Sequence, residues 1–161
     1  MCLFYYLHFK ITSKYHYFKK VDLKNRTNLD INRIIAHAGQ DVCDTLIGLH
    51  FFTGYNTVST FGGRGKIKAL KKIISEEAHR AFLQLGSEWN VSETLTTHLE
   101  RFTFNLYSKE MSTSDINELR YHLCCIKKGE IESHLLSPCL GCLKRHSERE
   151  HFQAAICKRS L

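Results

Sequence analysis

The sequence contains a single proline, Pro138, among 161 residues. Because proline breaks helices and favours extended linkers, its near-absence favours helices joined by Gly, Ser and Asn turns. No stretch approaches the ~20 consecutive apolar residues of a membrane-spanning helix, so we expect no membrane contact. We also expect no signal peptide at the N-terminus, because His8, Lys10 and Lys14 interrupt its apolar residues. We therefore expect the seven cysteines to be reduced thiols of an intracellular protein, nuclear or cytoplasmic.

Acidic residues are the minority among charged ones. The chain has 16 Asp and Glu against 23 Lys and Arg, a net charge of +7 at pH 7 with neutral histidine. This balance favours phosphate backbones or an acidic protein partner and does not choose between them. Apolar residues make up 43% of the chain, which is enough for the core of one domain.

Apolar residues recur at helical spacing from about residue 30 onward, which predicts a mainly α fold. We expect a helical bundle of six to eight short helices, with a helix-hairpin-helix element at residues 41–74. Residues 1–28 instead crowd aromatic side chains in a pattern closer to a strand, and we expect this segment to be strand-like or poorly ordered. The predicted regions are an N-terminal remnant (1–28), the helix-hairpin-helix-like region (29–86) and a C-terminal helical region packed on it (87–161).

Capping residues predict where the helices begin and end. Asn28 or Asp30 is expected to cap a first helix that Gly39 ends, and Asp41 starts a second one that stops at Gly54. Further helices are predicted at residues 67–74, 75–86, 92–107, 116–126 and 139–158, the last with Ser137 as its cap and Pro138 in its first turn.

The segment from Gly62 to Gly65 has the composition of a backbone phosphate-binding site. Glycines let the main chain approach an anion closely, and the start of the next helix offers N–H groups and the positive end of its dipole. Gly65→Val is expected to harm both binding and local structure if Gly65 has a positive φ or lies against the phosphate. The apolar stripe from Ile67 to Ile74 should face the core and leave the lysines outside. The predicted nucleic-acid contacts are Gly62, Gly63, Arg64, Gly65, Lys66, Lys68, Lys71 and Lys72; the simpler alternative is a tight helix connection followed by a solvated lysine face.

Cys139 and Cys142 form a CxxC pair, with His146 four residues later and His134 upstream, at spacing that zinc ligands use. On a helix that begins at Pro138, the two cysteines and His146 share one face. That face fits three metal ligands or an ordinary buried seam. Because no second CxxC is present, zinc is a hypothesis only, and no other cofactor is expected. Redox chemistry is the weaker interpretation, since no thioredoxin-like strand pattern precedes the pair.

The central stretch resembles the helix-hairpin-helix region of flap-endonuclease and XPG-type nucleases, which have a PIN-like core. The resemblance rests on residues 53–57 and on residues 63–69, which match a Gly-x-Gly-x-x-x-Ala hairpin that grips a DNA strand in those enzymes. A closer resemblance is to uncharacterised animal proteins linked to mobile elements. It covers most of residues 30–161, through residues 127–132, residues 149–156, and Leu49, His50, Phe52, Thr53, Gly54, Thr57, Ser59, Phe61, Gly63, Gly65 and Lys66.

Two departures from the nuclease pattern argue against catalysis. Where the pattern has Cys-Asp this chain has Tyr55 and Asn56, and a neutral amide is a poorer ligand for a hard divalent cation than a carboxylate. Two-metal hydrolysis also needs several converging carboxylates, whereas residues 1–40 offer only Asp22 and Asp30. The resemblance implies that longer relatives extend beyond this chain at both ends.

The sequence therefore predicts a non-catalytic remnant of a nuclease-like protein that binds DNA or RNA through the phosphate backbone, independently of base sequence. The first alternative is a residual metal-dependent nuclease. The others are a helical protein-interaction module and a mobile-element fragment without function.

Overall fold

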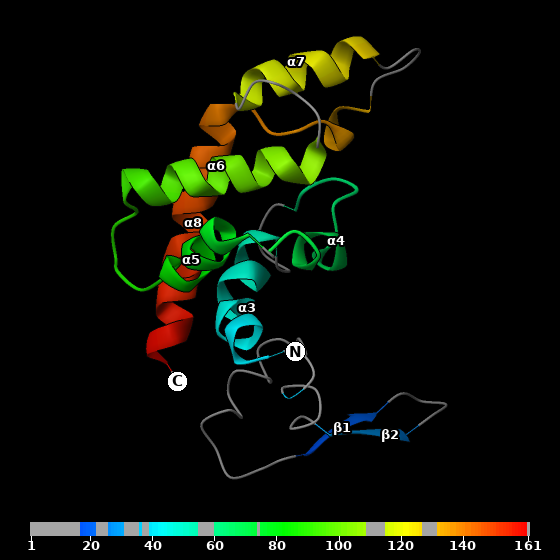
Figure 1. The fold of residues 1–161 in the computed structure, drawn as a ribbon, viewed down its shortest axis with the longest axis vertical. Coiled ribbons are helices and arrows are strands. Elements are labelled where there is room, and N and C mark those ends of the chain that lie inside the picture. The colour runs from blue at the N-terminus through cyan, green and yellow to red at the C-terminus, as the bar shows by residue number, and fades with distance from the viewer. Residues whose placement is uncertain are drawn as a thin grey trace.

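Six α-helices and one short 3-10 helix make up most of the described chain (Figure 1). The computed structural model describes residues 17–21, 26–30, 36, 39–54, 60–73, 75–108, 115–126 and 132–160. The predicted mainly α fold class is confirmed, and no described helix is long and apolar enough to cross a bilayer. The helices are α3 (Gln40–Phe52), α4 (Lys66–Leu70), α5 (Glu76–Gln84), α6 (Glu93–Tyr107), α7 (Ile116–Ile126), η1 (Ser133–Leu135) and α8 (Leu140–Arg159).

Two strands precede the helices. β1 (Tyr17–Val21) and β2 (Arg26–Asp30) pair antiparallel, with Tyr17 opposite Asp30. This agrees with the strand-like pattern of the aromatic segment, but β2 extends past the predicted boundary at residue 28. Asn28 pairs with Lys19 in the ladder and therefore does not cap a helix. Most of the first predicted helix, residues 31–38, lies outside the described residues.

Serine caps fix the starts of α5 and α6 as the sequence predicted. Ser75 Oγ accepts a hydrogen bond from Ala78 N at 3.3 Å, and Ser92 Oγ accepts one from Leu95 N at 3.1 Å. Each side chain satisfies an N–H that has no partner within its helix, which is why serine is favoured at this position. Glutamates in the first turn of each helix add a favourable interaction with the helix dipole.

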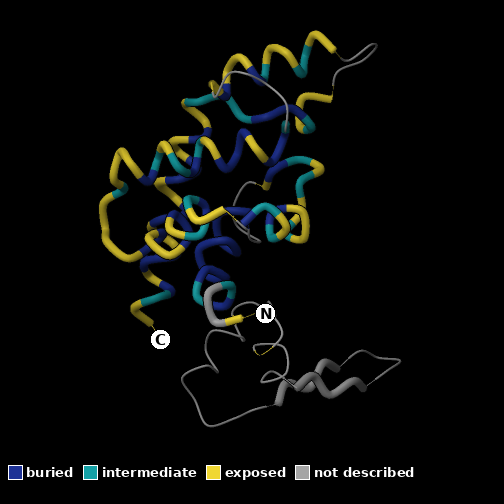
Figure 2. The backbone as a smooth tube through the Cα atoms, in the orientation of Figure 1, coloured by how far each residue is buried: buried dark blue, intermediate teal, exposed yellow. Residues whose placement is uncertain are grey.

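The core forms around α3, which packs against α5 and α8 while α6 lies across them (Figure 1). Figure 2 shows that α3 is buried along nearly its whole described length. Phe52, Phe82 and Phe102, one from each of α3, α5 and α6, meet edge to face, with ring centroids 4.7 to 6.1 Å apart. At Gly48 a Cβ would lie 2.3 Å from the main-chain oxygen of Phe82, so glycine permits this approach of α3 and α5.

The prediction for the helix after the glycine hairpin was wrong for Ile67, whereas Leu70 packs against the core as expected. α4 ends at Leu70, and Ile67, expected in the core, is 74% exposed. Ile73 is buried as predicted, Ala69 is buried as well, and Lys66 is half-buried. Lys66, Ala69 and Ile73 follow each other at helical spacing, so the face that the chain turns inward begins with a lysine.

The predicted cap of the last helix was also displaced. α8 begins at Leu140 with Cys139 at the N-cap position, whereas Ser137 lies before the helix and is buried. The N–H of Leu140 is satisfied from α7, because it donates to Asn117 Oδ1 at 2.9 Å. The hydrogen-bond acceptor at the start of α8 is therefore Asn117, which is distant in sequence, and not the nearby Ser137.

Candidate functional site

Lys66 joins the start of α4 to the end of α3. Its Nζ donates to the main-chain oxygens of His50 and Gly54, at 2.9 and 2.6 Å, and lies 3.3 Å from Thr53 Oγ1. Carbonyls at the end of a helix lack partners within it, and the negative end of the helix dipole favours a cation there. Protein oxygens thus hold the ammonium group that was expected to meet phosphate.

The glycines of the hairpin serve different purposes. At Gly62 a Cβ would lie 1.6 Å from the main-chain oxygen of His134, so this glycine admits the backbone of η1. Gly63 has φ +66, a left-handed conformation that glycine adopts without strain. Gly65 has φ −66 and a Cβ there would meet nothing within 4 Å, so of the two conditions named for this glycine the positive φ is not met. Of the three glycines of the hairpin, Gly65 alone therefore leaves open space beside the main chain.

The other residues of the hairpin face the core or an aromatic ring. Phe61 is buried, with its ring 5.3 Å from that of Phe52 and 5.0 Å from that of His146. The guanidinium of Arg64 lies 4.9 Å above the ring of Tyr107, a cation–π contact. Together with the hydrogen bonds of Lys66, these contacts fasten the hairpin to α3, α6 and α8. Phe61, Arg64 and Lys66 therefore have structural roles.

Lys68 and Lys71 are the exposed cations of the segment, and Lys72 is half-buried. Lys68 Nζ donates to the main-chain oxygen of Gly63 at 3.1 Å, so its charge lies beside the hairpin. Gly65, Lys68 and Lys71 recur every three residues, a spacing that keeps neighbouring side chains on one side of a helical turn. All three residues are exposed, so Lys68 and Lys71 lie at the surface close in sequence to Gly65.

A buried ionisable cluster, which the sequence analysis missed, lies between α3 and α8. Glu150 is 0% exposed, and neither of its carboxylate oxygens has a hydrogen-bond partner among the described residues. The ring of His146 lies one turn earlier, with Nδ1 3.8 Å from Glu150 Oε1, while its Nε2 bonds to the main-chain oxygen of Phe52 at 2.8 Å. Since a carbonyl can only accept, that nitrogen carries a proton in the neutral ring.

Burial dominates the protonation of this cluster. It raises the pKa of Glu150 to about 7, against the smaller opposing effects of the Arg149 and Lys66 cations. Burial and the charge of Lys66 lower the pKa of His50 to about 4, and burial also lowers the pKa of His146. Near neutral pH the histidines are therefore uncharged, and Glu150 is close to half protonated. The helical spacing of α8 could have indicated that Glu150 is buried. The buried residues Leu143, His146, Ser147, Glu150, Ala154 and Cys157 recur every one to four positions along this helix.

The predicted zinc ligands are divided between different environments. Cys139 and Cys142 lie together at the start of α8, half-buried and exposed respectively. His146 points to α3, and the exposed His134 lies in η1 with Nε2 3.6 Å from Glu132 Oε2. Among the described residues no group of three or more His, Cys, Asp and Glu side chains could hold a metal ion. The zinc hypothesis stays a prediction that this geometry does not support.

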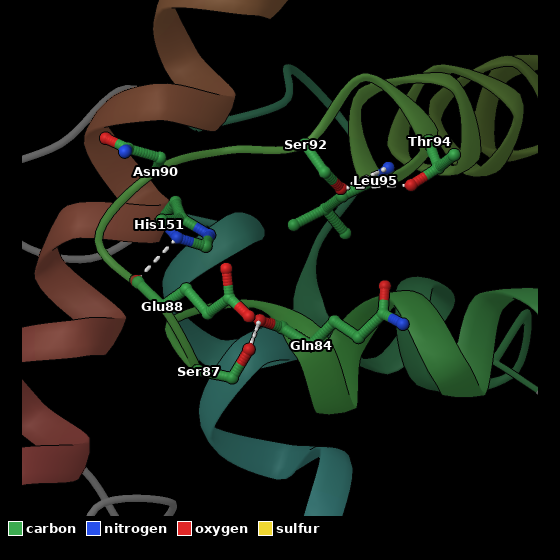
Figure 3. A pocket seen from close by; sticks show the side chains of 8 residues that line it. All are labelled: Gln84, Ser87, Glu88, Asn90, Ser92, Thr94, Leu95 and His151. Carbon is green, nitrogen blue, oxygen red and sulfur yellow. Dashed lines mark hydrogen bonds between the residues drawn. The ribbon is translucent and has the colours of Figure 1, made fainter.

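A polar pocket of about 180 Å³ lies at the turn between α5 and α6 (Figure 3). The buried His151 lines it and holds the turn. Gly86 N donates to His151 Nδ1 at 3.2 Å, so the proton of the neutral ring is on Nε2, which lies 2.8 Å from the main-chain oxygen of Glu88. Both ring nitrogens are used within the fold, so this histidine secures the turn against α8.

Asn56, the position that weakened the metal prediction, lies outside the described residues, and Asp44 is half-buried on α3. No protein-family model, curated protein or solved structure matches the chain. The nuclease-like resemblance therefore stays an expectation, and the hairpin with its exposed lysines is the candidate site on geometric grounds.

Proposed function

We propose that the protein is a non-catalytic nucleic-acid-binding protein that contacts the phosphate backbone, without base specificity, through Gly65, Lys68, Lys71 and Lys72. Lys66, Gly62 and Arg64 are left out of the contact set because their groups are committed within the fold.

The observation that carries the proposal is the exposed row of Gly65, Lys68 and Lys71. Residues 60–73 contain no Asp or Glu, so no carboxylate of this segment offsets the lysines or repels a phosphate. Ammonium groups recognise phosphate as point charges and do not read base edges, so they position a strand without selecting its sequence.

Most of the excess positive charge of the chain lies outside the helical part that contains these lysines. Residues 1–38 hold seven Lys and Arg against two Asp and Glu, whereas residues 39–161 hold sixteen against fourteen. The helical part is thus close to neutral, and its lysine row must act by local placement. The basic N-terminal segment, which includes Lys19 and Lys20, is the competing source of any affinity for nucleic acid.

A charge-matched pair of triple variants separates these sources. In the full chain, replacing Lys68, Lys71 and Lys72 by alanine should lower affinity for a short duplex of random sequence. It should also reduce the slope of log affinity against log salt by about two to three, since each phosphate contact accounts for ~0.9. The control replaces the exposed Arg80, Lys144 and Arg145 by alanine and removes the same charge elsewhere.

Fluorescence anisotropy over a salt series measures both variants. Equal affinity losses in the two triple variants would assign binding to net charge, and unchanged affinity in the lysine-row variant would refute the proposal. Gly65→Val adds a separate test: the space beside Gly65 admits a side chain, so the fold should persist while a closely approaching phosphate is excluded. Circular dichroism of each variant checks that the helices remain.

A further inference from the structure

The CxxC pair lies where a helix start brings two thiols together. Cys139 is the N-cap residue of α8, with φ −75 and ψ 162, and Cys142 is the third residue of the helix. Side chains at these two positions face each other, as they do when a cap residue and the third helical residue exchange hydrogen bonds. The two thiols are close enough for each to shift the pKa of the other. Closing a disulfide therefore needs side-chain rotation and no rearrangement of the helix.

The surroundings favour a thiolate on Cys139. The backbone N–H groups of Cys142 and Gly141, the Cys142 thiol and the Arg120 guanidinium all lie near its sulfur. These donors and this charge lower the pKa of Cys139, whereas the neighbouring sulfur raises the pKa of Cys142. Arg120 is anchored by its bond to the main-chain oxygen of Ser137.

The pair is also accessible. Cys142 is exposed, Cys139 is half-buried, and a Cβ at the exposed Gly141 between them would meet nothing within 4 Å. The other described cysteines differ: Cys43 and Cys157 are buried, and Cys124 and Cys125 are neighbours in sequence on α7.

We propose that Cys139 and Cys142 form a redox-active dithiol, in which Cys139 is the attacking sulfur and Cys142 resolves the intermediate with a disulfide substrate. Two thiols supply half of a tetrahedral zinc site, and His146 points away to the oxygen of Phe52, so the local arrangement fits dithiol chemistry better than metal binding.

The exchange takes place in two steps. The Cys139 thiolate attacks one sulfur of glutathione disulfide, forms a mixed disulfide and releases one glutathione thiolate. Cys142 then loses its proton to solvent and attacks the Cys139 sulfur, which closes the protein disulfide and releases the second glutathione. The two protein thiols are oxidised, and one glutathione disulfide is reduced to two molecules of glutathione.

The full chain, reduced and then equilibrated in glutathione buffers of defined ratio, tests the proposal by peptide mass mapping after acid quenching and alkylation. The wild type should give the 139–142 disulfide. Cys142→Ser should accumulate one glutathione on Cys139, and Cys139→Ser should accumulate several-fold less on Cys142. Serine is a good N-cap residue, so Cys139→Ser should preserve the helix start.

Alkylation rates supply a second measurement. At neutral pH Cys139 should react faster than the exposed Cys125, because the groups around the Cys139 sulfur favour its thiolate. Cys125→Ser is the control and should leave the 139–142 disulfide unchanged. Equal rates at Cys139 and Cys125, glutathione on Cys142 in preference to Cys139, or one zinc per chain that blocks exchange would each overturn the proposal.

Discussion

Replacing Glu150 by glutamine should make the protein more stable at alkaline pH. The carboxyl group is fully buried between α3 and α8, and its oxygens have no hydrogen-bond donor among the described residues. Glutamine keeps the shape of the side chain and cannot ionise. The substitution therefore removes the cost of a buried charge while leaving the packing of α8 in place.

The magnitude follows from the pKa. Burial raises the pKa of Glu150 from 4.5 to about 7, and one pKa unit corresponds to about 1.4 kcal/mol. Because the folded state holds this proton more tightly than the unfolded state, the protonated carboxyl contributes stability below pH 4.5. That stability is lost as pH rises through about 7. The total loss is about 3 kcal/mol, of which about 2 to 3 kcal/mol falls between pH 5 and pH 8.

In the wild type, the titration of His50 offsets part of the pH dependence of stability that Glu150 produces. Its pKa is lowered to about 4, so its contribution is present above pH 6.5 and lost as pH falls towards 4. Between about pH 4.5 and pH 6.5 the losses from Glu150 and His50 have opposite signs and nearly cancel. The stability difference between Glu150→Gln and wild type isolates the carboxyl, because His50 is common to both proteins.

Urea unfolding followed by circular dichroism at pH 5, 6, 7 and 8 measures this difference. The gain in unfolding free energy of Glu150→Gln over wild type should grow by about 2 to 3 kcal/mol from pH 5 to pH 8. Glu148→Gln, at an exposed position of the same helix, is the control for the same substitution outside the core. The same difference at pH 5 and pH 8 for Glu150→Gln would refute the assignment of a buried, proton-binding carboxyl.

Two further predictions concern the hairpin, and a third concerns catalysis. Lys66→Met should lower the unfolding free energy by about 1 to 3 kcal/mol, because carbonyls at the end of α3 lose a charged donor; urea unfolding measures it, and no change would show that the cap is dispensable. Gly62→Ala should cost at least about 2 kcal/mol, because its Cβ would overlap the main chain of η1, whereas Gly65→Ala should stay within about 0.5 kcal/mol, and equal costs would contradict this distinction. No magnesium- or manganese-dependent cleavage of flapped, single-stranded or duplex DNA is expected, and cleavage abolished by Asp44→Asn would show that the catalytic site had been misjudged.

Local chemistry made α5 and α6 predictable. Each has a serine at its N-cap and glutamate in its first turn, and these features act within a few residues of one another. The final helix was predictable from its apolar spacing, but its cap was not. The bond from Leu140 N to Asn117 Oδ1 joins residues 23 positions apart, which no local pattern reveals.

The contacts of Lys66 in the hairpin could not be predicted from the sequence, for a different reason. A lysine after glycines fits a phosphate as well as it fits the carbonyl end of another helix, because both present negatively polarised oxygens. Lys66 binds the carbonyl end of α3 because that helix ends within reach of its side chain. With Lys66 turned towards α3, the next residue, Ile67, faces solvent. The exposed positions of Lys68 and Lys71 follow from the same register.

The last bond of α3 sets an order for the folding of this chain. Phe52 O meets His146 Nε2 across 94 positions of sequence, and α8 also supplies a wall of the core around α3. Contacts this distant close slowly, since the intervening chain must first be brought together. During synthesis the apolar surface of α3 that α8 covers therefore stays exposed until α8 has left the ribosome. A product that stops before residue 140 would keep that surface exposed, which makes it a substrate for chaperones and proteases.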